Sequence, residues 1–343
     1  MLAVVNFSDR PGSVALQEID EPRPGVGQVL IRVKAVGVCG SDIHQWHGPV
    51  SYPVNYPVVL GHEFAGVVEE VGPGVDEWQP GDRVACETAA EVCGKCVYCR
   101  TGQYNVCPQR KGFGYGVNGA MTTYVVARKE LLHRIPDGVS FEEAALTEPA
   151  AVAYNAVVEK SHPRPGDLAV VIGPGPIGLM ALRVVRMFTP AHVIVVGLAR
   201  DEARLELARH LGADQIVVAD REDPVRAVRE WGDGLGADLV VDAVGVQQTL
   251  RQSLEMVRPN GQITKIGWGR DPIGFSLDPL IAKAATLQGT FSHTWPTWER
   301  VLRLMAAGRI NARAISETFP LTEWERAFRR MDSLAIAKAV LLP

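Results

Sequence analysis

The first 150 or so residues of the chain alternate short apolar segments with residues that favour turns. The apolar segments include 29–33, 57–60 and 64–68, and they are rich in β-branched side chains. Turn residues separate such segments at 72–74 (Gly-Pro-Gly) and 80–82 (Pro-Gly-Asp). Short β-branched runs bounded by Gly and Pro are typical of strands joined by tight turns. This part of the sequence therefore predicts a compact β-rich domain.

The pattern changes after about residue 153. An uninterrupted apolar run at 168–172 precedes a Gly-rich turn, a helical stretch and a second apolar run at 192–196. Further strands are predicted at residues 215–218, 239–241 and 262–266. Apolar strands that alternate with helices are typical of a parallel, doubly wound sheet. The chain becomes helical from about Trp295 and then returns to a strand at 339–342, which we expect to pack on the first domain.

These patterns predict an α/β protein with one domain formed by residues 1–153 and 293–343 and a second formed by residues 154–292. A chain of 343 residues, 47% of them hydrophobic, is long enough to bury large cores. Its formal net charge of -4 leaves no basic excess, so nucleic acid is not expected as a partner. The sequence shows no export signal and no run of about 20 apolar residues, so we expect a soluble, cytoplasmic protein that does not bind membranes.

Four of the six cysteines lie close together, at Cys93, Cys96, Cys99 and Cys107. In a reducing compartment, clustered cysteines favour metal thiolates over disulfides. Four thiolates with no open position form the structural type of zinc site. The alternatives are free or disulfide-linked cysteines, or a zinc ribbon that binds nucleic acid, which the acidic surroundings disfavour. We therefore expect a lobe at about 90–110 that is held by a structural zinc ion.

A second set of metal-ligand residue types comprises Cys39, His62, Glu63 and Glu148. A catalytic zinc takes about three ligands from thiolate, imidazole and carboxylate groups and leaves a position for water or substrate. Each residue alone has an ordinary explanation: Cys39 as a small buried side chain, His62 as a core histidine, Glu148 as a favourable carboxylate in a first helical turn. Their occurrence together with the cysteine quartet indicates a catalytic metal site.

Several motifs occur in an order that resembles the zinc-containing medium-chain alcohol dehydrogenases. They are Cys39-Gly-Ser41-Asp42-x-His44, Gly61-His62-Glu63-x-x-Gly66, Gly81-Asp82-Arg83-Val84, the cysteine quartet and a Gly-rich turn after the strand at 168–172. The resemblance covers essentially the whole chain. It is closer to the sorbitol (polyol) and threonine dehydrogenase branches, because Glu148-Pro149 stands near the point where other members of the family place a third cysteine ligand.

The resemblance implies a GroES-like β-rich catalytic domain followed by a Rossmann nicotinamide-binding domain. It implies that Cys39 and His62 bind the catalytic zinc, with Glu63 and Glu148 as exchangeable or water-mediated ligands. Ser41 and His44 match the family's proton relay. The alternative is that Ser41 only caps a helix beginning at Asp42 and that His44 is an exposed surface residue. The resemblance also suggests a homotetramer or homodimer.

The Gly-rich turn comprises Gly173, Gly175, Pro176, Ile177 and Gly178. Between a strand and a helix, G-x-G-x-x-G lets the backbone approach a pyrophosphate, which then lies at the helix N-terminus. An ordinary tight turn between strand and helix is the alternative.

The residues after the predicted strand at 192–196 bear on the choice between NAD and NADP. An acidic residue at the end of that strand usually binds the adenosine ribose of NAD, and 195–200 contains none. Arg200 and Arg204 could bind the 2′-phosphate of NADP, so the sequence favours NADP modestly. Asp201 could instead take the role of the missing acid, and Arg200 could simply be solvated.

The resemblance places Ile266, Gly267, Trp268, Phe291 and Ser292 near the nicotinamide ribose. We expect 46–52 and 291–295, which mix aromatic and polar residues, either to face a substrate cleft or to form a hinge. The predicted activity is zinc-dependent hydride transfer between a secondary alcohol of a polyol, sugar alcohol or cyclitol and NAD(P), with zinc as the Lewis acid. The runner-up substrate is an amino alcohol like L-threonine. A zinc-free quinone or enoyl reductase would lack both metal motifs, and a non-catalytic zinc-binding module would not need the Gly-rich turn.

Overall fold

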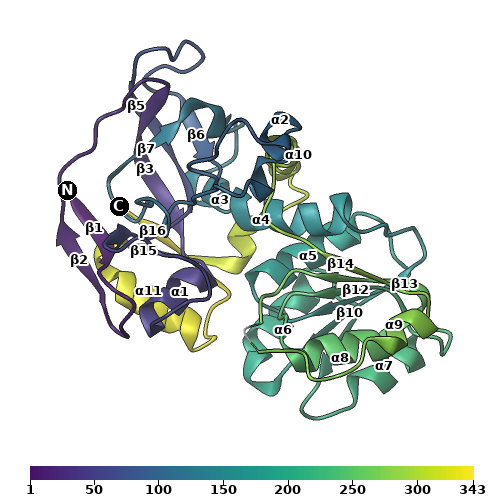
Figure 1. Cartoon of the computed structure of the whole chain (residues 1–343). Helices are drawn as coiled ribbons and strands as arrows, with labels where there is room; N and C mark the ends of the chain where they lie inside the picture. The colour runs from purple at the N-terminus through teal and green to yellow at the C-terminus, as the bar shows by residue number, and fades with distance from the viewer. Residues whose placement is uncertain (270) are drawn as a thin grey trace. The chain divides into compact units, whose positions relative to one another are not determined.

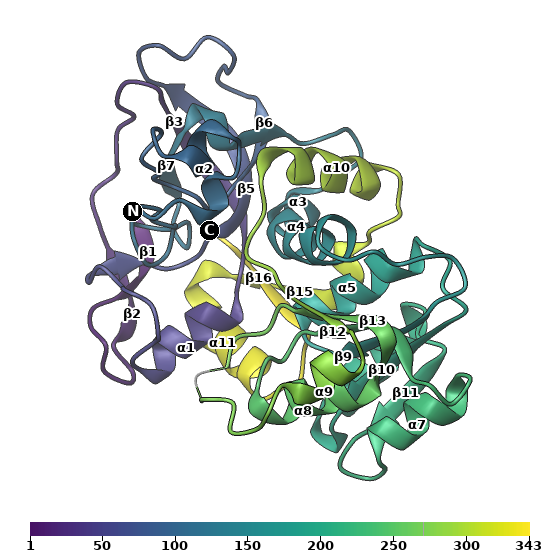
Figure 2. The same cartoon turned by 45° about the vertical axis from the view of Figure 1, so that its right-hand side comes forward.

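The computed structural model describes residues 1–269 and 271–343 and divides into two compact units. One unit comprises Met1–Glu148 and His293–Pro343, and the other comprises Pro149–Ser292. The chain first passes from one unit to the other between Glu148 and Pro149, within the helix α4 (Thr147–Tyr154). Figures 1 and 2 show the elements of both units.

The first unit is built on a seven-stranded sheet with the order β15-β16-β3-β5-β6-β8, in which β7 pairs with β3, and on a smaller sheet with the order β2-β1-β4. Its strands are β1 (Leu2–Asn6), β2 (Val14–Glu18), β3 (Gln28–Gly37), β4 (Val58–Val59), β5 (Glu63–Val71), β6 (Arg83–Cys86), β7 (Tyr124–Arg128), β8 (Leu132–Arg134), β15 (Ser316–Pro320) and β16 (Lys338–Leu342). Its helices are α1 (Gly40–His47), α2 (Val97–Arg100), α3 (Phe141–Ala145), α10 (Trp295–Ala306) and α11 (Trp324–Asp332).

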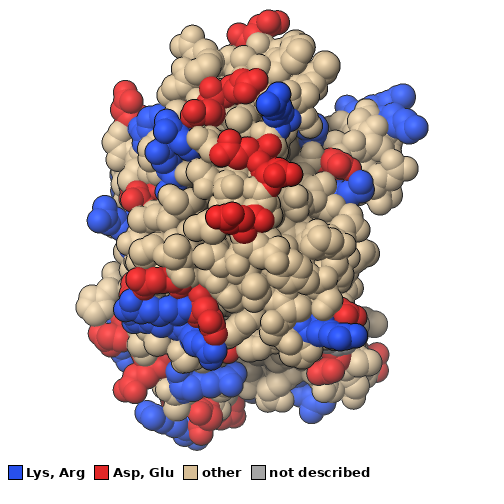
Figure 3. All heavy atoms as spheres, turned by 90° about the vertical axis from the view of Figure 1, so that its left-hand side faces the viewer, with Lys and Arg blue, Asp and Glu red and all other residues tan. Residues whose placement is uncertain are grey.

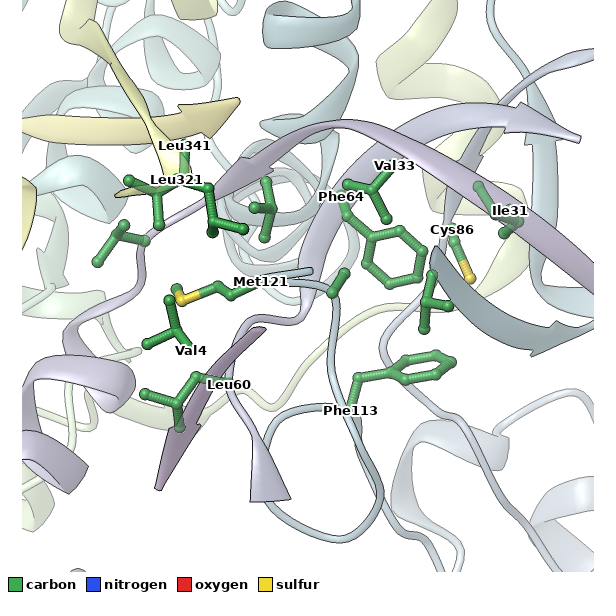
Figure 4. Packing of buried hydrophobic residues seen from close by; sticks show 14 of the residues in the cluster. Val4, Ile31, Val33, Leu60, Phe64, Cys86, Phe113, Met121, Leu321 and Leu341 are labelled. Atoms are coloured by element: carbon green, nitrogen blue, oxygen red, sulfur yellow. The ribbon is translucent and has the colours of Figure 1, made fainter. Parts of the chain in front are cut away.

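The last strand of the chain completes the large sheet of the first unit. β16 pairs antiparallel with β3, so that Leu341 lies opposite Val36. Both residues are fully buried. In the same core Phe64 and Phe113 pack edge to face with their ring centroids 5.3 Å apart, an arrangement that aromatic rings prefer. Figure 4 shows Leu341, Phe64 and Phe113 among the buried side chains of this core.

The second unit contains a six-stranded parallel sheet with the order β11-β10-β9-β12-β13-β14. Its strands are β9 (Leu168–Ile172), β10 (His192–Gly197), β11 (Gln215–Val218), β12 (Ala237–Asp242), β13 (Val257–Lys265) and β14 (Thr286–Gly289). Its helices are α5 (Pro176–Arg186), α6 (Glu202–His210), α7 (Pro224–Trp231), α8 (Gln247–Met256) and α9 (Asp278–Ala282). Figure 1 shows α5 on one side of the sheet and α7 and α8 on the other. Because helices cover both faces, every residue of β9 is buried and apolar. The molecule is therefore α/β, with a mixed-sheet unit and a Rossmann-type unit.

Charged side chains of both signs lie interspersed on the face shown in Figure 3, as expected for a formal net charge of only -4. Among the residues that the structure describes, none of the helices is both long enough and apolar enough to cross a bilayer.

Candidate metal centres and cofactor turn

The structure brings Cys39, His62 and Glu63 together. One ligand atom from each side chain lies within 4.8 Å of the others. Cys39 precedes α1 and Glu63 begins β5. The fully buried Asp42 joins the two segments, because its carboxylate accepts the Cys39 N–H at 2.8 Å and the Gly61 N–H at 3.3 Å. A thiolate, an imidazole and a carboxylate at this spacing form the donor set of a catalytic zinc site.

The electrostatics of this cluster fit a bound cation. Burial alone would lower the pKa of His62, but Cys39, Asp42 and Glu148 outweigh burial and raise it well above 6.5. The pocket thus carries an excess of negative charge that favours a proton on the imidazole. A divalent metal ion would neutralise the same charge without that proton.

Lys338 provides a positive charge beside Glu63. Its Nζ lies 2.6 Å from Oε1 of Glu63, and both residues are 1% exposed. Burial raises the pKa of Glu63, and the Lys338 ammonium opposes this rise. Burial by itself would lower the pKa of Lys338, but Glu63 and Cys39 raise it above its usual range. The sequence analysis did not identify Lys338, which is far from Glu63 in the chain.

Glu148 is not a member of the group formed by Cys39, His62 and Glu63. It begins α4, and its Oε1 lies 3.3 Å from Nε2 of His293. Burial would raise the pKa of Glu148, but the hydrogen bond from His293 and the charge of His62 lower it. The structure therefore keeps this carboxylate ionised and close enough to influence His62.

His293 is 2% exposed and lies in a polar network. The Trp298 indole N–H donates to its Nδ1 at 2.5 Å. The network continues through Glu87, whose Oε1 is 3.1 Å from Nε2 of His133, and Nδ1 of that ring is 2.8 Å from Oε1 of Glu299. The sequence analysis placed His293 in a segment expected to face a cleft, and it did not single out Glu87 or His133. No local motif distinguishes these residues, because their contacts depend on the folded arrangement.

The two residues proposed for a proton relay both lie on α1. This helix begins at Gly40 with Cys39 as its N-cap, so Ser41 lies in the first turn and does not cap the helix. His44 is exposed. The Tyr52 hydroxyl donates to the carbonyl oxygen of Ser41 at 3.4 Å. Tyr52 is close enough to Asp42 and Cys39 for their charges to add to the effect of burial, which raises its pKa.

Two aromatic residues of the segment 46–52 pack onto α11. The Trp46 ring lies edge-on to Trp324 and Phe328, with centroids 6.4 and 6.0 Å apart. Nε2 of His47 is 3.0 Å from Oδ1 of Asp332. Trp46 is thus a partly buried residue that packs against the core, and the His47 ring pairs with a carboxylate. The expectation that this segment faces a substrate cleft or forms a hinge stays a prediction.

The four cysteines of the lobe converge on one point. Their sulfur atoms lie within 4.8 Å of one another, with Sγ of Cys99 3.5 Å from that of Cys96 and 3.9 Å from that of Cys93. Tetrahedral zinc with Zn–S bonds of about 2.3 Å requires sulfur atoms about 3.8 Å apart. The backbone N–H groups of Lys95 and Cys96 lower the pKa of Cys93 to about 6. The geometry and the stabilised thiolate both fit a structural zinc ion, and all six cysteines are free.

The predicted Gly-rich turn lies between β9 and α5. Gly173 has a φ of +94°, and a Cβ atom on Gly178 would lie 1.8 Å from the Gly173 carbonyl oxygen. Both positions therefore require glycine. Gly175 is the N-cap of α5 and Pro176 follows at the first helical positions, next to Ile177. A Cβ on Gly175 would meet nothing within 4 Å, which leaves the helix N-terminus accessible to a phosphate.

The arginines after β10 differ in their exposure. Arg200 is exposed, whereas Arg204 on α6 is 8% exposed and burial lowers its pKa. Asp201 accepts the Leu198 N–H at 3.0 Å, and Asp220 accepts the Ala199 N–H at 2.9 Å. Both carboxylates thus bind backbone groups.

The residues expected at the nicotinamide ribose lie in the second unit. Ile266 is 8% exposed and is followed by Gly267, whereas Trp268 is 67% exposed. The rings of Trp268 and Phe291 are 6.0 Å apart, and the Ser292 carbonyl accepts a hydrogen bond from Asn155 at 2.8 Å.

Comparison with known proteins agrees with this description. Residues 25–137 match the alcohol dehydrogenase GroES-like domain, and residues 176–307 match the zinc-binding dehydrogenase family. The chain is 40% identical to a sorbitol dehydrogenase of Halalkalibacterium halodurans over 100% of this chain and 99% of the relative. It is 41% identical to a D-arabitol-phosphate dehydrogenase of Enterococcus avium, over 93% and 90% of the two chains. It is 36% identical to an L-threonine 3-dehydrogenase of Pyrococcus horikoshii, over 99% and 98%.

Solved structures share the whole fold. A zinc-binding dehydrogenase of Sinorhizobium meliloti bound to NADP and an alcohol dehydrogenase of Escherichia coli in complex with NADH each superpose with a TM-score of 0.91 at 26% identity, covering 100% of this chain and 99% of theirs. The fold, the donor set and these matches define the protein as a zinc-dependent oxidoreductase that acts on alcohols with NAD(P). The chain belongs to the zinc-containing medium-chain alcohol dehydrogenase superfamily.

Proposed function

We propose that this dehydrogenase oxidises a secondary alcohol of a polyol, sugar alcohol or cyclitol to a ketone and transfers the hydride to NAD(P). The observation that carries the proposal is the cluster of Cys39, His62 and Glu63, with Glu148 ionised nearby. Relatives that are named for sorbitol and D-arabitol phosphate, 40% and 41% identical to this chain, support a polyol as the substrate class.

In the proposed reaction Cys39 and His62 hold the zinc, with Glu63 and Glu148 as exchangeable or water-mediated ligands. Bound zinc would supply a Lewis acid that acidifies the substrate hydroxyl. Ser41 and His44 would carry the released proton to solvent, because a hydroxyl close to a metal ligand and an imidazole that titrates near neutrality suit this transfer. The cysteine quartet would hold a second, structural zinc ion.

The proposed cofactor site uses Gly173, Gly175 and Gly178 for the pyrophosphate at the start of α5. Further contacts are proposed for Pro176, Ile177, Ile266, Gly267, Trp268, Phe291 and Ser292. NADP is the favoured cofactor, with Arg200 and Arg204 as the phosphate-binding side chains. Support comes from the exposed position of Arg200 and from Asp201, which is engaged with the Leu198 N–H and does not point freely at a ribose.

The second candidate substrate is L-threonine or a similar amino alcohol, because the threonine 3-dehydrogenase of Pyrococcus horikoshii is almost as similar to this chain as the polyol enzymes. The competing substrates differ in the groups near the reacting carbon: a polyol presents further hydroxyls, whereas threonine presents an ammonium and a carboxylate. A homotetramer or homodimer is proposed from the family alone.

The deciding experiment is a screen of polyols, polyol phosphates, cyclitols and amino alcohols, each with NAD and with NADP, followed by the absorbance of the reduced nicotinamide. The proposal expects the highest kcat/KM with a polyol or cyclitol, and a clear preference for L-threonine would overturn it. Metal analysis is the companion measurement. Two zinc ions per chain are expected, one for each group of ligands, and Cys39→Ser should abolish turnover while the zinc of the quartet stays bound.

A further inference from the structure

Two side chains of the cysteine lobe (residues 90–110) reach out of the lobe on either side of Cys107. Tyr104 begins a short helical turn, and its carbonyl oxygen accepts the Cys107 N–H at 3.1 Å. The Arg110 N–H donates to the Cys107 carbonyl oxygen at 3.0 Å. A metal ion on the Cys107 sulfur therefore fixes the backbone from which both side chains project.

Tyr104 binds the carboxylate of Glu87, which follows β6 and is fully buried. The phenolic oxygen of Tyr104 lies 2.8 Å from Oε1 and 2.7 Å from Oε2 of Glu87. The same oxygen accepts the Trp295 backbone N–H at 2.6 Å. One hydroxyl of the lobe thus holds both Glu87 and the start of α10.

Arg110 binds Thr88, the residue that follows Glu87 in the chain. Nη2 of Arg110 donates to Oγ1 of Thr88 at 2.9 Å. Oγ1 of Thr88 is 3.5 Å from Nε2 of His293, whereas Oε2 of Glu87 is 3.8 Å from Nδ1 of that ring, beyond hydrogen-bond distance. Arg110 thus reaches His293 through Thr88, and Tyr104 reaches it through α10, which begins at Trp295 and carries Trp298, a hydrogen-bond donor to His293.

The orientation of His293 follows from its hydrogen bonds. The Trp298 indole nitrogen is a donor only, so the His293 Nδ1 that it contacts at 2.5 Å must be an acceptor. The ring proton then lies on Nε2, which donates to Oε1 of Glu148 at 3.3 Å. Trp298 is fully buried and its ring also packs edge-on to that of His293, with centroids 5.1 Å apart.

We propose that the cysteine lobe positions the catalytic site: Tyr104 holds the start of α10 and Arg110 holds Thr88, and Trp298 of α10 and Thr88 place His293 so that it orients Glu148 beside the catalytic zinc. The inference rests on the proposed function, because it assumes that Glu148 acts at that zinc. His293, Thr88 and Tyr104 are positioning residues in this scheme and touch neither substrate nor cofactor. Hydrogen-bond networks of this kind around metal ligands affect metal affinity or activity by about 10- to 100-fold.

The test compares Tyr104→Phe with Tyr98→Phe. Tyr98 belongs to α2 in the same lobe and is 41% exposed, so it is a matched control for the loss of a hydroxyl. Each variant is dialysed as the holoenzyme against increasing concentrations of a zinc chelator, and the remaining zinc is counted. We expect Tyr104→Phe to release the catalytic zinc at about tenfold lower chelator concentration and to lower kcat more than it raises KM, whereas Tyr98→Phe should match the wild type.

A second measurement separates the two metal sites. In the Cys39→Ser background the remaining zinc reports on the lobe alone, and Tyr104→Phe should leave its retention unchanged. Arg110→Met provides an independent arm that leaves Tyr104 intact, and it should shift the retention of catalytic zinc in the same direction. His293→Leu removes the donor to Glu148 and should lower the zinc affinity. His293→Gln keeps a donor and should retain most of that affinity.

Glu148→Gln distinguishes failure of the inference from failure of the proposed function. If Glu148→Gln weakens zinc retention and turnover but Tyr104→Phe and Arg110→Met both behave like Tyr98→Phe, the lobe does not position the site and the inference is wrong. If Glu148→Gln itself has no effect on either measurement, the proposed role of Glu148 is wrong and the inference falls with it.

Discussion

Nζ of Lys338 lies 2.6 Å from Oε1 of Glu63, although the two residues are 275 positions apart in the sequence. Both side chains are 1% exposed, so neither charge is solvated by water. A buried ion pair is often no more stabilising than well-packed apolar residues, but removing one partner leaves an uncompensated charge in the interior. This relationship makes the last strand of the chain a part of the candidate zinc site.

Lys338→Met keeps the length of the side chain and removes its charge. We expect it to lower the free energy of unfolding by about 3–5 kcal/mol, because Glu63 would stay buried without its ammonium partner. Chemical denaturation followed by circular dichroism measures this difference. The matched control is Lys129→Met, which removes a more exposed ion pair with Glu77 and should destabilise the protein much less, because solvent screens exposed pairs. Equal effects of the two substitutions would contradict the importance of burial.

The glycines of the cofactor turn are predicted to differ in their roles. Gly178→Ala should destabilise the second unit, because its Cβ would lie 1.8 Å from the Gly173 carbonyl oxygen. Gly175→Ala meets nothing within 4 Å in the protein, so it should fold normally and weaken nucleotide binding by crowding the pyrophosphate. Thermal unfolding and calorimetric titration with NADP separate these effects. Normal binding by a folded Gly175→Ala variant would argue that the turn is only structural.

The preference for NADP can be tested at Arg200. Arg200→Ala should raise KM for NADP about tenfold, the loss of one charge-assisted contact worth about 1.4 kcal/mol, and should leave KM for NAD unchanged. Arg200 is the better target, since Arg204 is 8% exposed and its replacement would also disturb packing. An unchanged KM for both cofactors would mean that Arg200 is merely solvated.

A pH effect is expected for Asp82. Burial opposes its ionisation, but hydrogen bonds from Arg134 and from the Gln79 N–H outweigh burial and lower its pKa. Since the folded pKa lies below the unfolded value of about 3.9, the stabilisation is complete above that value and is lost as the pH falls through the folded pKa.

The corresponding measurement is the difference in unfolding free energy between the wild type and Asp82→Asn. At pH 7 it should be less than about 1 kcal/mol, because Arg134 is largely exposed. It should shrink towards zero in acid. Release of metal at low pH affects both proteins alike and cancels in this difference, so a gap that widens in acid would contradict the prediction.

Features encoded by nearby residues could be predicted from the sequence. The apolar run at 168–172 is the strand β9 with the same bounds, because a strand that is covered by helices on both faces reads as a continuous apolar run. The cysteine quartet is similarly local, since 14 residues separate Cys93 from Cys107 and the chain needs only to fold around one ion.

Contacts between distant segments could not be predicted in this way. Lys338 resembles any lysine near a strand end, and only the pairing of β16 with β3 brings it to Glu63. The aromatic segment that begins at Trp46 was expected to face a cleft or to form a hinge, and no nearby residue indicated the contacts that the Trp46 ring makes with Trp324 and Phe328. His293 was noticed for its neighbours in sequence, whereas its role depends on Glu148, which is 145 residues away.

The return of β16 to the sheet of the first unit has a consequence for biosynthesis. Domains fold largely as units while the chain is synthesised from its N-terminus. The first unit cannot do so early, because His293–Pro343 emerges after all of Pro149–Ser292. The Rossmann-type unit can therefore complete its sheet first, while Glu63 has no ion-pair partner until Lys338 is synthesised. A ribosome stalled within the last strand would hold a chain with a formed cofactor turn and an unfinished zinc site.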